Sequence, residues 1–384
     1  MSEPLLDIRP VCLEALENHL QTLLAMCSSP FYLPNPNKGR DLSHSLAFLY
    51  DTTSDTIPIA CGHCKECIAR RQTDIVQAFQ IEIMESDLFF FTLTYNDNIP
   101  VITTPVGDVQ YPDISDIQNM FKRLRRYNKF GEPFKYFVVS ERGTKKFRPH
   151  YHGVIAFPKI KDSEYMSVMR NKNREYNYWG TLLNEWKRNI GSTRSPVYLP
   201  LCTYERKNGR YNYDFHWLDP KDTAEGEADV AFYVTKYITK YDNREHKLLY
   251  KIQMNTQNTE EFKDYRRMIR TRYFASKSFG KAVTAKQIAH IRKGIEYAKH
   301  NDIGYACFIN PISGRHFPLA PRYRKFLTID DALTIYYNRQ TDNIDNSFIT
   351  LTDIANEAQK RMLKNQQQKN FEKNMKKNAK KFVD

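Results

Sequence analysis

Three runs of aromatic and β-branched residues constrain the fold of this chain more than any other feature. They span residues 88–95, 136–141 and 150–157, and such residues favour strands. Helical patterns begin near Ile68, Ile114 and Tyr165. A further strand is expected at 197–203 and a helix from Asp229. This β-α-β-β-α-β-α order predicts an α+β fold, an antiparallel sheet of about four to five strands with helices packed on it.

The chain is long enough for more than one domain. We expect an N-terminal helical region over residues 1–85, a central sheet domain over 86–245 and an accessory region over 246–384. Both additions are expected to be mainly helical. The last segment, 360–384, holds nine lysines and arginines against two acidic residues, which indicates a basic helix or a disordered arm.

The charge of the chain points to an anionic partner. The net charge is +14 and the pI is about 9.2, values typical of proteins that bind nucleic acid or an anionic surface. The 25 tyrosines and 23 phenylalanines include surface for stacking on bases, although most are expected in the core. No run approaches the roughly 18 apolar residues of a membrane helix, and no signal peptide is evident. We therefore expect a cytoplasmic protein.

Seven cysteines, three of them in Cys61-Gly-His-Cys64-Lys-Glu-Cys67, fit thiol or metal chemistry better than a disulfide framework. Cys61, Cys64 and Cys67 could bind Zn²⁺, but a structural zinc site has four ligands. His63 or a distant residue would be the fourth ligand; the distant candidates are Cys12, Cys27, His44 and Cys202. A thiol cluster without metal remains the alternative. Arg70 and Arg71, just downstream, are candidate DNA contacts.

Two histidines at alternate positions, His150 and His152, are candidate metal ligands. Alternate residues of a strand point to the same face, so both imidazoles can reach one divalent ion. If the strands 136–141 and 150–157 pair antiparallel, Glu141 lies beside them, and we expect its carboxylate as the third ligand. Nitrogen ligands favour Mn²⁺ and cellular abundance favours Mg²⁺. The ion would polarise a phosphate.

The segment after Asp229 carries two tyrosines, Tyr233 and Tyr237, each followed three residues later by a lysine, Lys236 and Lys240. Residues four apart lie on one stripe of a helix, so both phenols can face the same phosphate. A phenol has a pKa of about 10, and a nearby lysine can lower it and also hold a phosphate. An aromatic stripe is usually core, but lysine is rarely buried.

Three ordered motifs then carry a family resemblance: Phe91-Thr-Leu-Thr-Tyr95, Arg148-Pro-His-Tyr-His-Gly153 and Tyr233-Val-Thr-Lys-Tyr-Ile-Thr-Lys240. With the cysteine cluster, they resemble the HUH endonuclease superfamily, whose sheet is ferredoxin/RRM-like. Within it, the chain is similar to the rolling-circle replication initiators of Microviridae, especially the gokushovirus-like branch. The likeness covers roughly residues 60–245. Residues 268–280 match the family's later Arg- and Gly-rich segment only loosely, and 208–227 reads as an insertion.

The resemblance implies a nuclease for single-stranded viral origin DNA. Tyr233 or Tyr237 would attack a phosphate, form a 5′-phosphotyrosyl link and free a 3′-OH, with His150, His152 and Glu141 holding the metal. Lys145, Lys146 and Arg148 are expected DNA contacts. No P-loop motif is present, so a host helicase would unwind the DNA. The alternatives are a plasmid relaxase, a single-strand transposase, or a DNA- or RNA-binding protein without catalysis.

Overall fold

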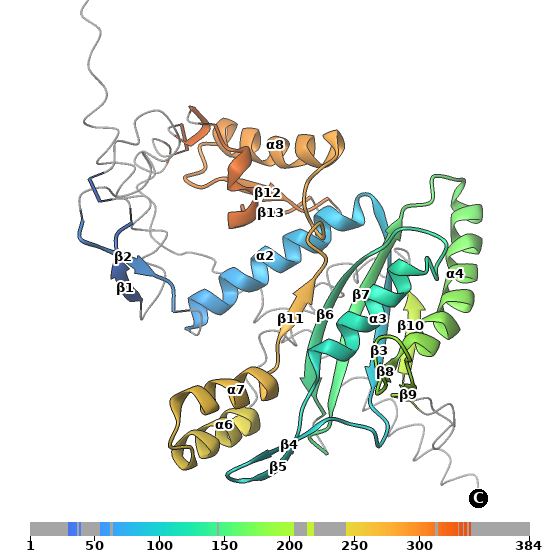
Figure 1. The fold of residues 1–384 in the computed structure, drawn as a ribbon. Coiled ribbons are helices and arrows are strands. Elements are labelled where there is room, and N and C mark those ends of the chain that lie inside the picture. The colour runs from blue at the N-terminus through green and yellow to red at the C-terminus, as the bar shows by residue number, and fades with distance from the viewer. Residues whose placement is uncertain are drawn as a thin grey trace, which may run out of the picture. The chain divides into compact units, whose positions relative to one another are not determined.

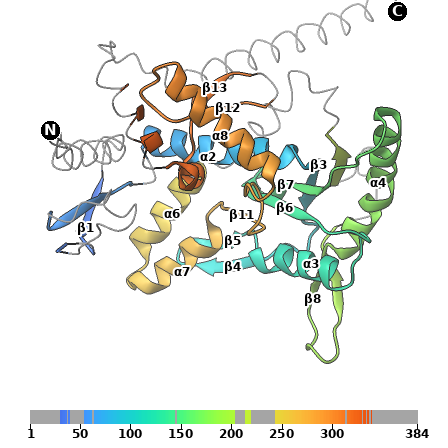
Figure 2. The ribbon, with the colours of Figure 1, turned by 90° about the horizontal axis from the view of Figure 1, so that it is seen from above.

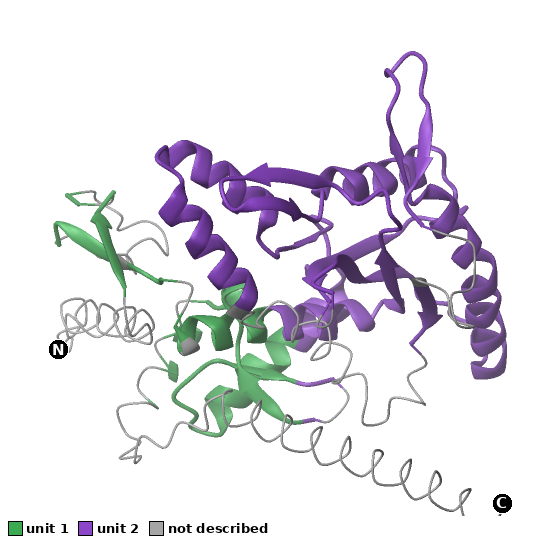
Figure 3. Cartoon of the chain, turned by 90° about the horizontal axis from the view of Figure 1, so that it is seen from below, with its two compact units in different colours: residues 1–74, 291–309, 315–384 green, residues 75–290, 310–314 purple. Residues whose placement is uncertain are grey.

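The computed structural model groups the chain into two compact units, described here separately. Unit 1 takes residues 1–74, 291–309 and 315–384, and unit 2 takes 75–290 and 310–314 (Figure 3). The residues that the structure describes are 30–36, 38–39, 54–61, 64–143, 146–202, 213–218, 243–311, 314–328, 330–332, 334–335 and 338. The predicted helices at 10–26 and from Asp229, and the basic segment 360–384, lie outside them.

Unit 2 is built on a five-stranded antiparallel sheet with strand order β10-β3-β7-β6-β11 (Figure 1). The strands are β3 (Ser86–Thr94), β6 (Lys135–Arg142), β7 (Pro149–Pro158), β10 (Tyr213–Trp217) and β11 (Tyr273–Ala275). The three strands predicted from the aromatic runs form its centre. The predicted fold class is confirmed.

The two outer strands come from segments that the sequence pattern did not assign to the sheet. β10 lies in the 208–227 segment, and β11 lies in the loosely matching 268–280 segment. The strand expected at 197–203 exists as β9 (Tyr198–Pro200), but it pairs with β8 (Lys187–Asn189) in a separate hairpin. Short strands of three to five residues carry too little periodicity for the pattern to place them.

Two helices cover one face of the sheet: α3 (Ile114–Arg126) and α4 (Glu164–Glu185). They extend over the positions predicted for them. Asp113 caps α3 by accepting a hydrogen bond from the Ser115 amide. The buried cluster on this face includes Phe91, Phe121, Tyr151 and Leu182. Alternation along β7 sends Tyr151 and Ile155 to this face, and the histidines therefore point to the other one.

The C-terminal part of α2 (Lys65–Ile83) covers the opposite face. Its residues Ile75, Val76 and Phe79 pack with Phe137 and Val154 of the sheet. The carboxylate of Glu82, fully buried in this layer, accepts hydrogen bonds from Lys135, Ser86 and the Gly280 amide.

The segment that matches the family only loosely packs tightly onto α2. Gly280 has a φ of +64°, and a Cβ there would lie 2.4 Å from the Ala78 Cβ. Phe279 contacts Phe79 with ring centroids 4.9 Å apart. Residues 279–280 therefore have a packing role, which explains a glycine at this position.

Two small hairpins lie side by side next to the sheet (Figures 1 and 2). One pairs β4 (Val101–Thr104) with β5 (Gly107–Gln110), and the other joins α6 (Asn243–Asn255) to α7 (Thr259–Ile269). Val109, Ile252 and Ile269 form their shared core. Asn258 caps α7 through the Glu260 amide.

Unit 1 contains two further hairpins in its described residues. β1 (Phe31–Pro34) pairs with β2 (Thr56–Ile59), and β12 (Cys307–Ile309) with β13 (His316–Pro318). The C-terminal half of α8 (Ala285–His300) and the 3-10 helix η2 (Pro321–Phe326) complete this part. Arg292 of α8 pairs with the buried carboxylate of Asp331. Within the described residues, no helix could span a membrane.

Candidate active site

Glu141, His150 and His152 come together where β6 and β7 pair. In the antiparallel register, Glu141 lies opposite His150, and His152 lies opposite Val139. Oε2 of Glu141 is 3.4 Å from Nε2 of His150 and 3.3 Å from Nε2 of His152. The antiparallel pairing expected from the sequence is thus present, and it brings the carboxylate to the two imidazoles.

Each imidazole is held from behind through its other nitrogen. Nδ1 of His150 lies 3.2 Å from the backbone oxygen of Arg148, which can only accept, so this nitrogen carries the proton. Nδ1 of His152 lies 3.0 Å from Oγ1 of Thr92. With both protons on Nδ1, the Nε2 lone pairs face Glu141, which is the tautomer a metal ligand needs.

The donor set fits a divalent cation. Glu141 and His152 are each only 8% exposed, and a buried carboxylate needs compensating positive charge or hydrogen bonds. The ligand atoms of the three residues all lie within 4.8 Å of one another. Two nitrogens and one oxygen suit Mn²⁺ and other transition ions, and they also admit Mg²⁺. Three protein ligands leave coordination positions open for a phosphate oxygen or water.

The glycine after the second histidine has a steric reason. A Cβ at Gly153 would lie 2.4 Å from Cζ of Phe91 and 2.7 Å from the Phe137 carbonyl oxygen. Phe91 lies directly opposite Gly153 in the β3–β7 register. The Phe91 and Gly153 positions of two separate motifs are therefore one packing unit behind the histidines.

The turn between β6 and β7 is anchored by two arginines. Arg142 donates to the backbone oxygens of Gln110 at 2.7 Å and of Ile269 at 3.1 Å. The guanidinium carbons of Arg142 and Arg244 each lie 4.8 Å from the centroid of the Phe147 ring. Arg244 also donates to the Gly143 carbonyl at 3.3 Å. These contacts fix the end of the hairpin from which His150 projects.

The expected DNA contacts in this turn have different surroundings. Lys146 is exposed, and Lys145 lies outside the described residues. Arg148 donates to the Asn96 carbonyl and lies 3.2 Å from the Asp97 carboxylate. Arg148 thus links the turn to the chain after β3, and a role in DNA binding stays a prediction.

The candidate nucleophiles Tyr233 and Tyr237, with Lys236 and Lys240, lie outside the described residues. The structure therefore describes only the metal-binding half of the predicted site. The face on which that half lies is the one that carries His150 and His152, with Phe90 stacked on His152 at a centroid distance of 5.8 Å.

Sequence reasoning missed two polar residues on this same face, Asp214 and His216 of β10. Asp214 lies opposite Thr92, which in turn lies opposite His152. Nδ1 of His216 is 3.2 Å from Oδ2 of Asp214. The hydrogen bond from His216 lowers the pKa of Asp214 despite partial burial, and His152 adds a smaller effect in the same direction. The signal was the alternation Tyr213-Asp-Phe-His-Trp217, hidden in a polar segment.

The cysteine cluster and its neighbouring arginines belong to the described part of unit 1. Cys61, Cys64 and Cys67 are close enough to share a metal ion. Arg70 and Arg71 are partly exposed on α2. Burial, and next the charge of Arg70, lowers the pKa of Arg324 to about 10. Two guanidiniums near each other favour an anion, which is consistent with the expected DNA contact of Arg70.

Comparison with known proteins gives this arrangement its context. Residues 88–242 match the family model of the replication-associated protein ORF2. The replication-associated protein ORF4 of Chlamydia phage 1 is 28% identical over 189 residues. The resemblance to Microviridae replication initiators is confirmed.

The extent of the match to these replication-associated proteins is limited. The alignment covers 48% of this chain and 39% of the Chlamydia phage protein. The chain therefore aligns with less than half the length of that relative. No solved structure matches the chain significantly. The family model does include β3, β6, β7 and β10, and with them the Glu141, His150 and His152 site.

Proposed function

We propose that this protein initiates rolling-circle replication by nicking single-stranded DNA at a viral origin. The observation that carries the proposal is the Glu141–His150–His152 group, with Nε2 of each histidine within 3.4 Å of one carboxylate oxygen. This group lies inside the region that matches replication-associated proteins. Paired tyrosines downstream in the sequence supply the nucleophiles.

The proposed reaction exchanges one phosphodiester for another. The phenol oxygen of Tyr233 or Tyr237 forms a bond to phosphorus, and the bond from phosphorus to the 3′ oxygen breaks. The phenol loses its proton, and the departing 3′ oxygen gains one. The products are a 5′-phosphotyrosyl link and a free 3′-OH, and the reverse reaction rejoins strands without ATP because the link keeps the phosphodiester energy.

The residues of the chain divide the work. Glu141, His150 and His152 hold a divalent ion, Mg²⁺ or Mn²⁺, which when bound polarises the scissile phosphate. Thr92 and the Arg148 backbone oxygen keep the imidazoles oriented. Lys236 and Lys240 bring positive charge to the phenols and the phosphate. A second tyrosine allows a second cleavage at the regenerated origin and closure of the displaced circle.

The proposed partners follow from this chemistry. Single-stranded origin DNA is the substrate, and Arg70, Arg71, Lys145, Lys146 and Arg148 are proposed contacts to its phosphates. A helicase and polymerase of the bacterial host would unwind and extend the DNA in the cytoplasm. Phosphate contacts of this kind make binding weaker at high salt.

The test is covalent trapping. The protein is incubated with Mn²⁺ and single-stranded oligonucleotides that tile the viral origin, and adducts are detected on a denaturing gel. The expected result is an adduct that EDTA abolishes and that the Tyr233→Phe/Tyr237→Phe double variant cannot form. Salt-sensitive binding without an adduct, unaffected by EDTA, would instead indicate a DNA-binding protein without catalysis.

A further inference from the structure

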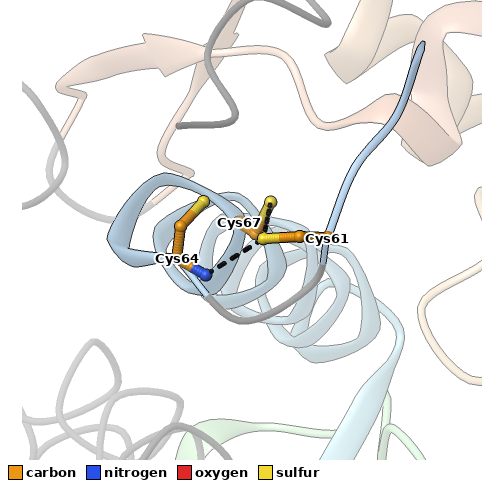
Figure 4. A group of neighbouring side chains, drawn as sticks. All are labelled: Cys61, Cys64 and Cys67. Atoms are coloured by element: carbon orange, nitrogen blue, oxygen red, sulfur yellow. Dashed lines mark hydrogen bonds between the residues drawn. The ribbon is translucent and has the colours of Figure 1, made fainter. Parts of the chain in front are cut away.

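Three cysteine sulfurs gather at the start of α2, away from the residues of the proposed nuclease chemistry (Figure 4). Cys61 follows the end of β2 by two residues, Cys64 directly precedes α2, and Cys67 lies in its first turn. The three Sγ atoms all lie within 4.8 Å of one another, and those of Cys61 and Cys67 are 3.9 Å apart. This spacing is close enough for one ion to contact all three.

The backbone around the cluster is arranged to support negative sulfur. The Cys64 amide donates to Sγ of Cys61 at 3.3 Å, as it can when a Cys-x-x-Cys loop folds around one centre. The cluster also lies at the N-terminal end of a 19-residue helix, where the helix dipole favours thiolate over thiol. Three thiolates this close would repel one another unless a cation lies between them.

The two other described cysteines show the contrast. Cys307 is fully buried and Cys202 nearly so. Burial raises the pKa of the Cys202 thiol to about 11 and that of Cys307 to about 12. Both therefore stay protonated near neutral pH. Sγ of Cys202 contacts the Leu183 carbonyl inside the sheet core, so Cys202 is a core residue and does not complete the cluster.

We propose that Cys61, Cys64 and Cys67 bind a structural Zn²⁺ ion that ties the end of β2 to the first turn of α2. Thiolates are soft ligands and select Zn²⁺ over Mg²⁺ and Mn²⁺. A structural zinc site has a fourth ligand, and the nearest candidate in the sequence, His63, lies outside the described residues. The chain then carries two metal sites of different chemistry, a sulfur site here and a nitrogen and oxygen site at Glu141.

A zinc ion would have a mechanical purpose at this position. Only two residues separate Ile59 of β2 from the cluster, so the ion fixes the exit of the β1–β2 hairpin relative to α2 within unit 1. Arg70 and Arg71 follow Cys67 on the same helix. Zinc binding therefore also fixes where these two proposed DNA contacts begin. Structural zinc sites contribute directly to folding free energy.

The first experiment measures zinc in the full chain purified without added metal. Elemental analysis should find one Zn²⁺ per chain. Replacement by Co²⁺ should give the near-ultraviolet charge-transfer band of thiolate–cobalt bonds. Cys61→Ser and Cys64→Ser, at partly exposed positions, should each lose the zinc and the band, whereas Cys202→Ala should keep both. Cys64→His, which replaces one zinc ligand by another, should keep zinc and weaken the band.

The second experiment separates this site from the nuclease site. His150→Ala should keep its zinc while losing Mn²⁺ binding, and Cys64→Ser should keep Mn²⁺ binding while losing zinc. The proposal is overturned if the wild-type chain holds neither zinc nor the cobalt band, or if the Cys61→Ser/Cys64→Ser double variant retains zinc. A failure of origin nicking would leave these zinc results unchanged, so the two proposals fail independently.

Discussion

Oγ1 of Thr92 on β3 lies 3.0 Å from Nδ1 of His152 on β7. The two residues are direct partners in the antiparallel register, so the sheet itself places the hydroxyl behind the imidazole. Thr92 belongs to the Phe91-Thr-Leu-Thr-Tyr95 motif and His152 to the histidine motif. The relationship gives the first motif a physical role: it orients a proposed metal ligand.

Thr92→Val tests this role because valine keeps the shape of threonine and removes the hydroxyl. His152 then loses the partner that fixes its Nδ1 proton. Loss of such an outer contact weakens metal binding about 10- to 100-fold, and calorimetric titration with Mn²⁺ measures it. Thr94→Val is the matched control on the same face of the same strand, opposite His150. Equal Mn²⁺ affinities in the two variants would contradict the role of Thr92.

Glu141→Gln should weaken Mn²⁺ binding more than Thr92→Val does. The change removes the only carboxylate of the group while keeping its size, so two neutral imidazoles remain to hold a dication. Adduct formation on origin oligonucleotides should fall in the same order. Circular dichroism of the metal-free protein checks that the fold is kept. A variant that binds Mn²⁺ as tightly as the parent would remove Glu141 from the site.

Gly153→Ala should destabilise unit 2 by about 1–3 kcal/mol, the usual cost of overpacking. The added methyl would meet the Phe91 ring and the Phe137 carbonyl oxygen at under 3 Å. Shortening Phe91 in the same chain should restore stability only in part, because the carbonyl stays. Gly180→Ala, inside α4 with no atom near the new methyl, should raise stability by about 0.5–1 kcal/mol. Urea denaturation compares them, and a neutral Gly153→Ala would contradict the packing described.

Alkaline pH should destabilise the protein in part through Cys307. Burial raises the pKa of this thiol from 9.0 to about 12. The contribution of Cys307 to stability is therefore complete below pH 9.0 and is lost as the pH rises toward about 12, because only the unfolded chain loses the proton early in that range. Urea denaturation above pH 9.0 should show a shallower pH dependence for Cys307→Ala than for the parent. Parallel curves would contradict burial as the cause.

The centre of the sheet and its metal ligands could be predicted because the necessary signals are local. The β6–β7 hairpin has a short turn, so antiparallel pairing follows from the sequence and places Glu141 opposite His150. The alternation of His150 and His152 then fixes a common face. The aromatic run before Tyr95 identified β3 for the same reason, since buried strands are rich in such residues.

The edges of the sheet could not be predicted because they depend on distant contacts. β10 and β11 are short, and each is held by a partner strand more than a hundred residues away. Asp214 and His216 were therefore missed, although they share a face with His152. The backbone oxygen of Arg148 and the hydroxyl of Thr92 likewise gave no sequence signal as supports for imidazoles. Their roles depend on three-dimensional register.

The most direct test of the account is mass spectrometry of the covalent adduct formed with origin DNA and Mn²⁺. After nuclease and protease digestion, the account predicts a peptide containing Tyr233 or Tyr237 that carries the 5′ phosphate of the cleaved strand. His150→Ala/His152→Ala should yield no such peptide. A wild-type protein that cleaves origin DNA without any tyrosine-linked nucleotide, or that links it at a tyrosine outside this pair, would contradict the account.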